Sequence, residues 1–291
     1  MKRILLLLVG VGGLWLAWDA SPGAHPRHGA EWLPAGDLRL RVVRAGQGDT
    51  TLLLLHGYGE SLMAYRAVFD RLARHHRVVA LDLPGFGLSD KAAGPYDLAT
   101  LEHTLEDFIS RWIQGPIVVV GHSMGGELAV ALALARPDRI AGLVLIAPAG
   151  NGLNPLLGDS GIASLGAGWV AGALTFVLPV HDPNWLEEPA DRADYEPGRD
   201  SAYRRVARQV LAEFDFSAVG ERFRDLKQPA LVIWGREDPT IPLAVGVRLA
   251  AMIPCHRLVV LPGTLHRPHQ TEPDTVVAET ETFLREMSCP R

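Results

Sequence analysis

A serine between two glycines, directly after a short apolar run, is the feature that most constrains the fold. Residues 117–120 are all apolar and indicate a buried strand, and the apolar stretch 128–135 predicts a helix that ends before Pro137. Between them, Ser123 has Gly121 two positions before it and Gly125 two positions after it. A sharp turn from strand to helix leaves room only for small neighbours and exposes the serine hydroxyl at the head of the helix. The segment therefore predicts a nucleophile, although ordinary glycine-rich turns also contain this pattern.

The rest of the chain predicts a largely parallel sheet covered by helices. Short apolar segments alternate with amphipathic ones, and we expect each short segment to form a buried strand. These segments are residues 51–55, 78–81, 141–146, 230–234 and 258–261, whereas residues 38–43 alternate as an edge strand would. Residues 65–72, which Ser61 precedes as a candidate cap, and residues 101–112 predict helices. The fold class is therefore α/β, a mostly parallel central sheet with helices on both faces, and residues 38–43 are expected at its edge.

This alternation of strands and helices stops between Pro148 and about Arg224. Residues 160–180 carry no charge and are long enough to span a membrane. A span there would separate strands that must share one sheet, so we expect a helical cap inserted at about 149–224 within a domain of residues 31–291. Trp169 and Phe176 are candidates to line a substrate pocket in this cap. The alternative is ordinary helix packing with no role in substrate choice.

The N-terminal residues 1–30 differ in character from the predicted domain. Lys2 and Arg3 precede an uncharged apolar stretch, residues 4–18, which is followed by a Pro/Gly-rich segment at 21–29. This order is typical of an export signal or of an uncleaved membrane anchor followed by a linker. We therefore expect an exported or membrane-anchored protein, with a buried N-terminal helix and a cytoplasmic location as the alternative.

Composition excludes some classes of function. The formal net charge of −5 provides no basic surface for nucleic acid. The two cysteines, Cys255 and Cys289, form no C-x-x-C pair, which argues against a structural metal and leaves a disulfide between them open. The oligomeric state is not indicated.

Two side chains late in the chain could activate Ser123. A serine hydroxyl is a weak nucleophile near neutral pH, so it needs a base within hydrogen-bond reach, and that base needs a partner that fixes its tautomer. His266 follows the last predicted strand, and Asp238 follows the strand before it. We expect His266 to take the proton and Asp238 to orient the imidazole. His269 is the alternative base, and His122 is expected to face away from the pocket.

With these residues in place, the chain resembles the α/β-hydrolase fold family. The resemblance rests on the loop 56–59 (HGYG), the loop 82–90 (DLPGFGLSD), the turn around Ser123, the segment 234–238 (WGRED) and His266. The chain order Ser, Asp, His is the one that this family uses. The resemblance implies an oxyanion hole formed by the backbone N–H groups of Tyr58 and Met124. It also implies a serine hydrolase that needs no cofactor and forms an acyl-enzyme on Ser123, with a small-molecule ester of an apolar acid as substrate.

The resemblance leaves other functions open. Carbon–carbon hydrolases of ring-cleavage products and haloperoxidase-like members share this layout, whereas the halide- and epoxide-cleaving branches use aspartate in place of Ser123. A non-catalytic binding module of the same fold is a further alternative. Related proteins also usually carry a small residue directly before the histidine, where this chain has Leu265.

Overall fold

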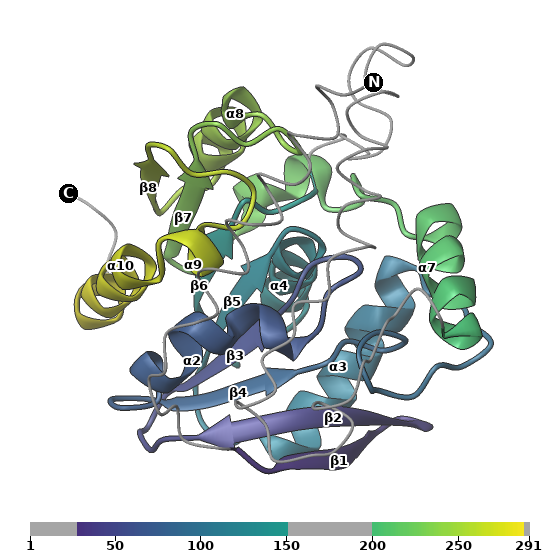
Figure 1. The fold of residues 1–291 in the computed structure, drawn as a ribbon. Helices are drawn as coiled ribbons and strands as arrows, with labels where there is room; N and C mark the ends of the chain where they lie inside the picture. Colours follow the sequence, from purple (N-terminus) through teal and green to yellow (C-terminus); the bar gives the residue numbers. More distant parts are fainter. Residues whose placement is uncertain (1–27, 151–199, 288–291) are drawn as a thin grey trace, which may run out of the picture.

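The computed structural model describes residues 28–150 and 200–287, and it confirms the predicted α/β fold. Eight strands form one sheet in the order β1-β2-β4-β3-β5-β6-β7-β8 (Figure 1). Strands β1 and β2 are antiparallel to their neighbours, and the strands from β4 to β8 along this order are parallel. The strands are β1 (Ala30–Ala35), β2 (Leu38–Ala45), β3 (Thr51–Leu55), β4 (Arg77–Leu81), β5 (Ile117–His122), β6 (Ile140–Ile146), β7 (Ala230–Gly235) and β8 (His256–Leu261).

Helices cover both faces of the sheet, so the central strands are apolar on both sides. In β5, for example, Ile117 and Val119 belong to one hydrophobic core, and Val118 and Val120 belong to the other. The first core includes side chains of α3 (Leu98–Trp112), α4 (Met124–Ala135), α7 (Ser201–Glu213), η3 (Gly220–Asp225) and α8 (Leu243–Met252). The second includes side chains of η1 (Leu62–Tyr65), α2 (Arg66–Leu72) and α10 (Pro273–Glu286). Burial on both faces explains why these strands are continuous apolar runs without alternation.

The edge of the sheet differs from the sequence-based expectation. The expected edge segment 38–43 lies in β2, which is the second strand, and β1 is the edge strand. The sequence of β1 is AEWLPA, in which Pro34 weakens the strand signal, and proline is tolerated in a sheet mainly at its edge. The two strands are joined at Gly36, whose φ of 56° lies in the left-handed region that glycine adopts at little cost.

Several predictions concern residues outside the described ranges. The N-terminal segment up to residue 27, cap residues 151–199 including Trp169 and Phe176, and Cys289 all lie there. The division into an N-terminal segment, a domain and a cap at about 149–224 therefore stays a prediction. The disulfide that the sequence left open is present at Cys255, which is disulfide-bonded. In the part of the chain that the structure covers, no helix has the length and apolar character needed to cross a bilayer.

The parallel strands bring the motifs together. Strands β3, β5, β7 and β8 run in the same direction, so the loops that follow them meet at one edge of the sheet. Those loops carry His56, Ser123, Asp238 and His266, respectively.

Candidate active site

Ser123 stands in a strained turn between β5 and α4. Its φ of 51° and ψ of −117° lie in a region that residues other than glycine rarely adopt. The glycines around it are required by close backbone contacts. A Cβ on Gly121 would lie 2.3 Å from the carbonyl oxygen of Gly125, and a Cβ on Gly125 would lie 2.1 Å from that of Leu55. The sequence pattern therefore corresponds to a turn that has no room for larger residues.

Backbone hydrogen bonds hold this turn in place. The Ser123 amide donates to the carbonyl oxygen of Ile146 at 3.0 Å, and the Ser123 carbonyl oxygen accepts from the amides of Gly126 and Ala149 at 2.9 Å each. Only 8% of Ser123 is exposed, and the residue is the N-cap of α4. The N–H of Met124, the first residue of α4, has no carbonyl partner within the helix and lies at the positive end of the helix dipole.

Asp238 and His266 form a hydrogen-bonded pair. The Nδ1 atom of His266 lies 2.7 Å from Oδ2 of Asp238, whose side chain is fully buried. The other carboxylate oxygen, Oδ1, accepts from the amides of Thr240 at 2.8 Å and Ile241 at 3.0 Å. A carboxylate can only accept, so in this pair the Nδ1 atom of His266 carries the proton and donates it to Oδ2. The Nε2 atom of His266 is then left as the acceptor.

Burial keeps His266 neutral near neutral pH. Desolvation lowers the pKa of His266 below its ordinary value, although the nearby Asp238 carboxylate raises it in part. The loop that carries His266 also contacts the residue before the serine. The backbone carbonyl oxygen of His266 lies 2.9 Å from Nε2 of His122, and the imidazole rings of His122 and His266 have centroids 4.8 Å apart.

The alternative base, His269, has a different environment. His269 is fully buried in α9 (Pro268–Thr271). Its ring centroid lies 4.6 Å from that of His122 and 5.0 Å from that of Tyr65. Among the described residues, neither of its ring nitrogens has a hydrogen-bond partner. Burial lowers the pKa of His269 well below its ordinary value. The carboxylate of Asp238 therefore pairs with His266 and not with His269.

The loop after β3 brings Tyr58 to the same edge of the sheet. His56, at its start, receives a hydrogen bond from the Leu83 amide at Nε2 (2.9 Å) and donates from Nδ1 to the Gly57 carbonyl oxygen (2.8 Å). This loop is also bonded to α7. The Tyr58 hydroxyl donates to the Ala207 carbonyl oxygen at 3.0 Å, and the Tyr203 hydroxyl donates to that of Gly59 at 2.8 Å. These bonds fix the backbone that carries the Tyr58 amide.

A buried ion pair between Asp82 and Arg41 determines the shape of the loop 82–90. Asp82 is fully buried, pairs with Arg41 at 3.1 Å and accepts from the amides of Leu62 and Leu88 at 2.7 and 2.8 Å. Gly87 takes a φ of 49°, and a Cβ there would lie 2.2 Å from the Asp82 carboxylate. The loop is thus shaped around one buried ion pair.

Two further residues take part in the site, and the sequence analysis missed both. Glu60 accepts at Oε2 from the Gly57 amide (2.9 Å) and lies 3.0 Å from Nδ1 of His122. Its Oε1 lies 2.6 Å from Nε of Arg267. His122 is buried in this network rather than exposed to a pocket. The only sequence signal was the position of Glu60 directly after the HGYG loop and of Arg267 directly after His266.

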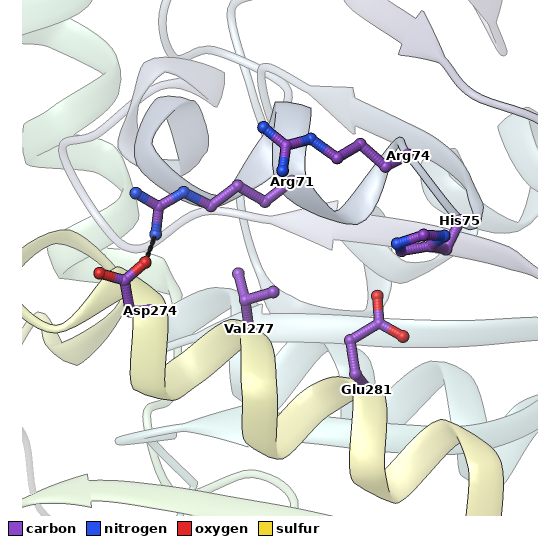
Figure 2. A pocket seen from close by; sticks show the side chains of 6 residues that line it. All are labelled: Arg71, Arg74, His75, Asp274, Val277 and Glu281. Atoms are coloured by element: carbon purple, nitrogen blue, oxygen red, sulfur yellow. Dashed lines mark hydrogen bonds and ion pairs between the residues drawn. The ribbon is translucent and has the colours of Figure 1, made fainter.

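The described residues offer a surface groove but no metal-ligand cluster as further candidates for a ligand site. In residues 28–150 and 200–287, no three His, Cys, Asp or Glu side chains are grouped to share a metal ion. A groove of about 420 Å³ lies between α2 and α10, where Arg71 forms an ion pair with Asp274 (Figure 2). Its remaining lining residues are Arg74, His75, Val277 and Glu281. None of the predicted site residues lines this groove.

Known proteins share this fold and sequence pattern. The model of the alpha/beta hydrolase family matches residues 52–280. An uncharacterized hydrolase of Bacillus subtilis is 26% identical over 248 residues, which cover 82% of this chain and 91% of that protein. The 2-hydroxy-6-oxononadienedioate/2-hydroxy-6-oxononatrienedioate hydrolase 2 of Pseudomonas putida is 30% identical over 246 residues, or 79% of this chain and 86% of the relative.

A solved structure extends the likeness over nearly the whole chain. The crystal structure of a membrane phospholipase A, a bacterial virulence factor, superposes with a TM-score of 0.71 at 22% identity and covers 99% of both chains. Together with the family match, these comparisons identify the chain as a hydrolase that belongs to the alpha/beta hydrolase family.

Proposed function

We propose that the protein is a serine hydrolase that forms an acyl-enzyme on Ser123, with His266 as the base and Asp238 as the acid that orients it. The observation that carries this proposal is the 2.7 Å bond between His266 and the buried Asp238, in a loop that contacts the residue before Ser123. That bond places the imidazole proton on Nδ1, which leaves Nε2 free to accept the serine proton.

The reaction follows from these groups. The Ser123 oxygen bonds to the substrate carbonyl carbon while its proton passes to Nε2 of His266. The carbonyl oxygen becomes an oxyanion, which the backbone N–H groups of Tyr58 and Met124 stabilise. The intermediate then breaks the bond to the leaving group, which takes the proton from His266. Water then attacks the acyl carbon while His266 takes its proton. The bond to Ser123 breaks, the Ser123 oxygen takes that proton from His266, and the acid is released.

We further propose a carboxylic ester of an apolar acid as the substrate. The uncharged sequence of residues 160–180, with Trp169 and Phe176, supports an apolar acyl site in the cap. The likeness to the structure of a membrane phospholipase A also supports it. No cofactor takes part in the proposed chemistry.

Carbon–carbon bond hydrolysis is the second candidate. The specific observation in its favour is the 30% identity to a 2-hydroxy-6-oxononadienedioate hydrolase over most of both chains. The same serine, histidine and aspartate would serve either reaction, so the substrate must distinguish them.

Two experiments test these proposals. A fluorophosphonate probe should label the wild-type protein and not the Ser123→Ala variant, whereas no labelling of either would favour a non-catalytic binding module. Purified protein should then be assayed with p-nitrophenyl esters of graded chain length and with a ring-cleavage product. Ester hydrolysis without turnover of the ring-cleavage product supports the first candidate, and the opposite result supports the second.

We also propose that residues 1–30 export or anchor the protein. The proposal rests on the order of charged, apolar and Pro/Gly-rich residues in the sequence. Fractionation of cells that express the full chain, followed by N-terminal sequencing, would test it. Recovery of an uncleaved chain from the soluble cytoplasmic fraction would contradict it.

A further inference from the structure

A buried carboxylate connects the three segments that carry the proposed catalytic groups. The Glu60 side chain is 5% exposed, and its hydrogen-bond and ion-pair partners are Gly57, His122 and Arg267. Each partner is the immediate neighbour, in the sequence, of a group that the proposed mechanism uses. These neighbouring pairs are Gly57 with Tyr58, His122 with Ser123, and Arg267 with His266.

All the partners of Glu60 point a nitrogen at it. Oε2 faces the Gly57 amide and Nδ1 of His122, and Oε1 faces Nε of Arg267. A protonated carboxyl would need an acceptor for its own proton, and only Nδ1 of His122 could serve, whereas the Gly57 amide and the Arg267 guanidinium both favour the anion. Burial alone would raise the pKa of Glu60, but the nearby His122 and Arg267 hold it well below its ordinary value. Glu60 is therefore a buried anion.

His122 faces acceptors on both sides. Its Nδ1 lies 3.0 Å from the Glu60 carboxylate, and its Nε2 lies 2.9 Å from the His266 carbonyl oxygen. An ionised carboxylate and a carbonyl oxygen can only accept, so both bonds form only if both ring nitrogens carry a proton. The other titratable or charged groups near His122 include His56, Tyr65, His266, Arg267 and His269. Each of them is neutral or cationic, so Glu60 is the anion that balances the charge of His122.

We propose that Glu60 is a positioning residue: it keeps His122 doubly protonated and thereby holds the HGYG loop, the serine turn and the histidine loop in one arrangement. The inference rests on the proposed function for the roles of Tyr58, Ser123 and His266. In this role Glu60 acts on the reacting groups only through its neighbours Gly57, His122 and Arg267. Its effect reaches them through the backbone of Gly57 and the carbonyl group of His266.

The protonation of His122 can be measured in the wild-type protein. We expect ¹⁵N NMR to show a proton on both ring nitrogens of His122 at about pH 7.5, where a histidine with an ordinary pKa of about 6.5 is mostly neutral. A signal from one unprotonated ring nitrogen would overturn the proposal. This measurement needs no variant and no substrate, so it decides the question even if Glu60→Gln does not fold.

The Glu60→Gln variant tests the effect on the reaction. The amide keeps the size of the side chain but removes the charge, and its NH₂ group cannot accept from Gly57 or His122. We expect kcat to fall about 100-fold, the order that small misplacement of catalytic groups produces, while KM changes little. We also expect His122 to lose one ring proton. The matched control is Glu237→Gln, an exposed carboxylate beside Asp238, which should leave both kcat and the His122 signal unchanged.

The outcomes separate this inference from the proposed function. Wild-type kcat in Glu60→Gln, or an equal loss in Glu237→Gln, would refute the positioning role in an active enzyme. A wild-type protein that reacts with no ester, ring-cleavage product or fluorophosphonate would instead refute the proposed function. The His122 spectrum would then still decide whether Glu60 holds the ring doubly protonated.

Discussion

Replacing Asp238 by asparagine tests how much of the rate depends on the position of the ring proton of His266. In the wild type, Oδ1 accepts two backbone hydrogen bonds, from Thr240 and Ile241, and Oδ2 accepts the Nδ1 proton of His266. An asparagine has one oxygen, and the two backbone donors hold it. The NH₂ group then faces His266, so Nδ1 must become an acceptor and the ring proton moves to Nε2. In that tautomer His266 cannot take the proton of Ser123.

The size of the effect follows from this rearrangement. The two backbone bonds survive, so the loop keeps its shape and only the proton is misplaced. For a Ser-His-Asp arrangement in the wrong tautomer, kcat is expected to fall about 10⁴-fold, which corresponds to about 5.4 kcal/mol of transition-state stabilisation. KM should change little, because the carboxylate is buried away from the substrate.

The assay is hydrolysis of the best p-nitrophenyl ester found for the wild type, with thermal unfolding measured in parallel. Glu237→Gln makes the same chemical change on the adjacent exposed residue and should retain the wild-type rate. A folded Asp238→Asn variant that keeps more than about a tenth of the wild-type kcat, where about 10⁻⁴ is expected, would refute the assignment of Asp238.

Three further predictions concern other groups. Because burial lowers the pKa of His266, kcat/KM should fall as pH decreases through a midpoint below about 6.5, and a midpoint above that value would contradict the neutral base. Glu127 is buried, and desolvation raises its pKa from 4.5 to about 8, so the folded state holds a proton that the unfolded state releases across this range. As pH rises between these values, the free energy of unfolding of the wild type should therefore fall relative to that of Glu127→Gln by up to about 1.4 kcal/mol per pH unit. Urea unfolding at several pH values measures this difference, and a difference between the two proteins that stays constant with pH would contradict the prediction. Trp169→Ala should change the preference among ester chain lengths more than the maximal rate, and equal losses on short and long esters would contradict an acyl site there.

The central strands could be predicted from the sequence because local signals determine them. Residues 52–55 and 117–120 are apolar runs bounded by loops, and both lie in buried strands at the centre of the sheet. The turn at Ser123 was predictable for a similar reason, because Gly121 and Gly125 meet backbone oxygens that leave no space for a side chain. The pairing of Asp238 with His266 needed one further step, that the ends of neighbouring parallel strands lie together.

The parts that were missed depend on contacts between distant residues. Strand β1 pairs with β2 across Gly36, but its sequence contains Pro34 and follows a Pro/Gly-rich segment, so its local signal resembles that of a linker. Glu60 and Arg267 lie far apart in the sequence although their side chains meet in the fold, and no sequence periodicity relates them. A buried ion pair of this kind arises from the tertiary fold, and a single sequence carries no pattern that identifies it.

The tight turn around Ser123 also limits how such a protein could be redesigned. Its glycines press against main-chain oxygens, which cannot rotate aside as a side chain would, so a random library that includes these positions would consist mostly of defective clones. Efforts to alter selectivity should therefore leave this turn unchanged and diversify the proposed cap, starting from Trp169 and Phe176. Main-chain contacts thus mark the positions that a library should exclude before any screen for new substrates begins.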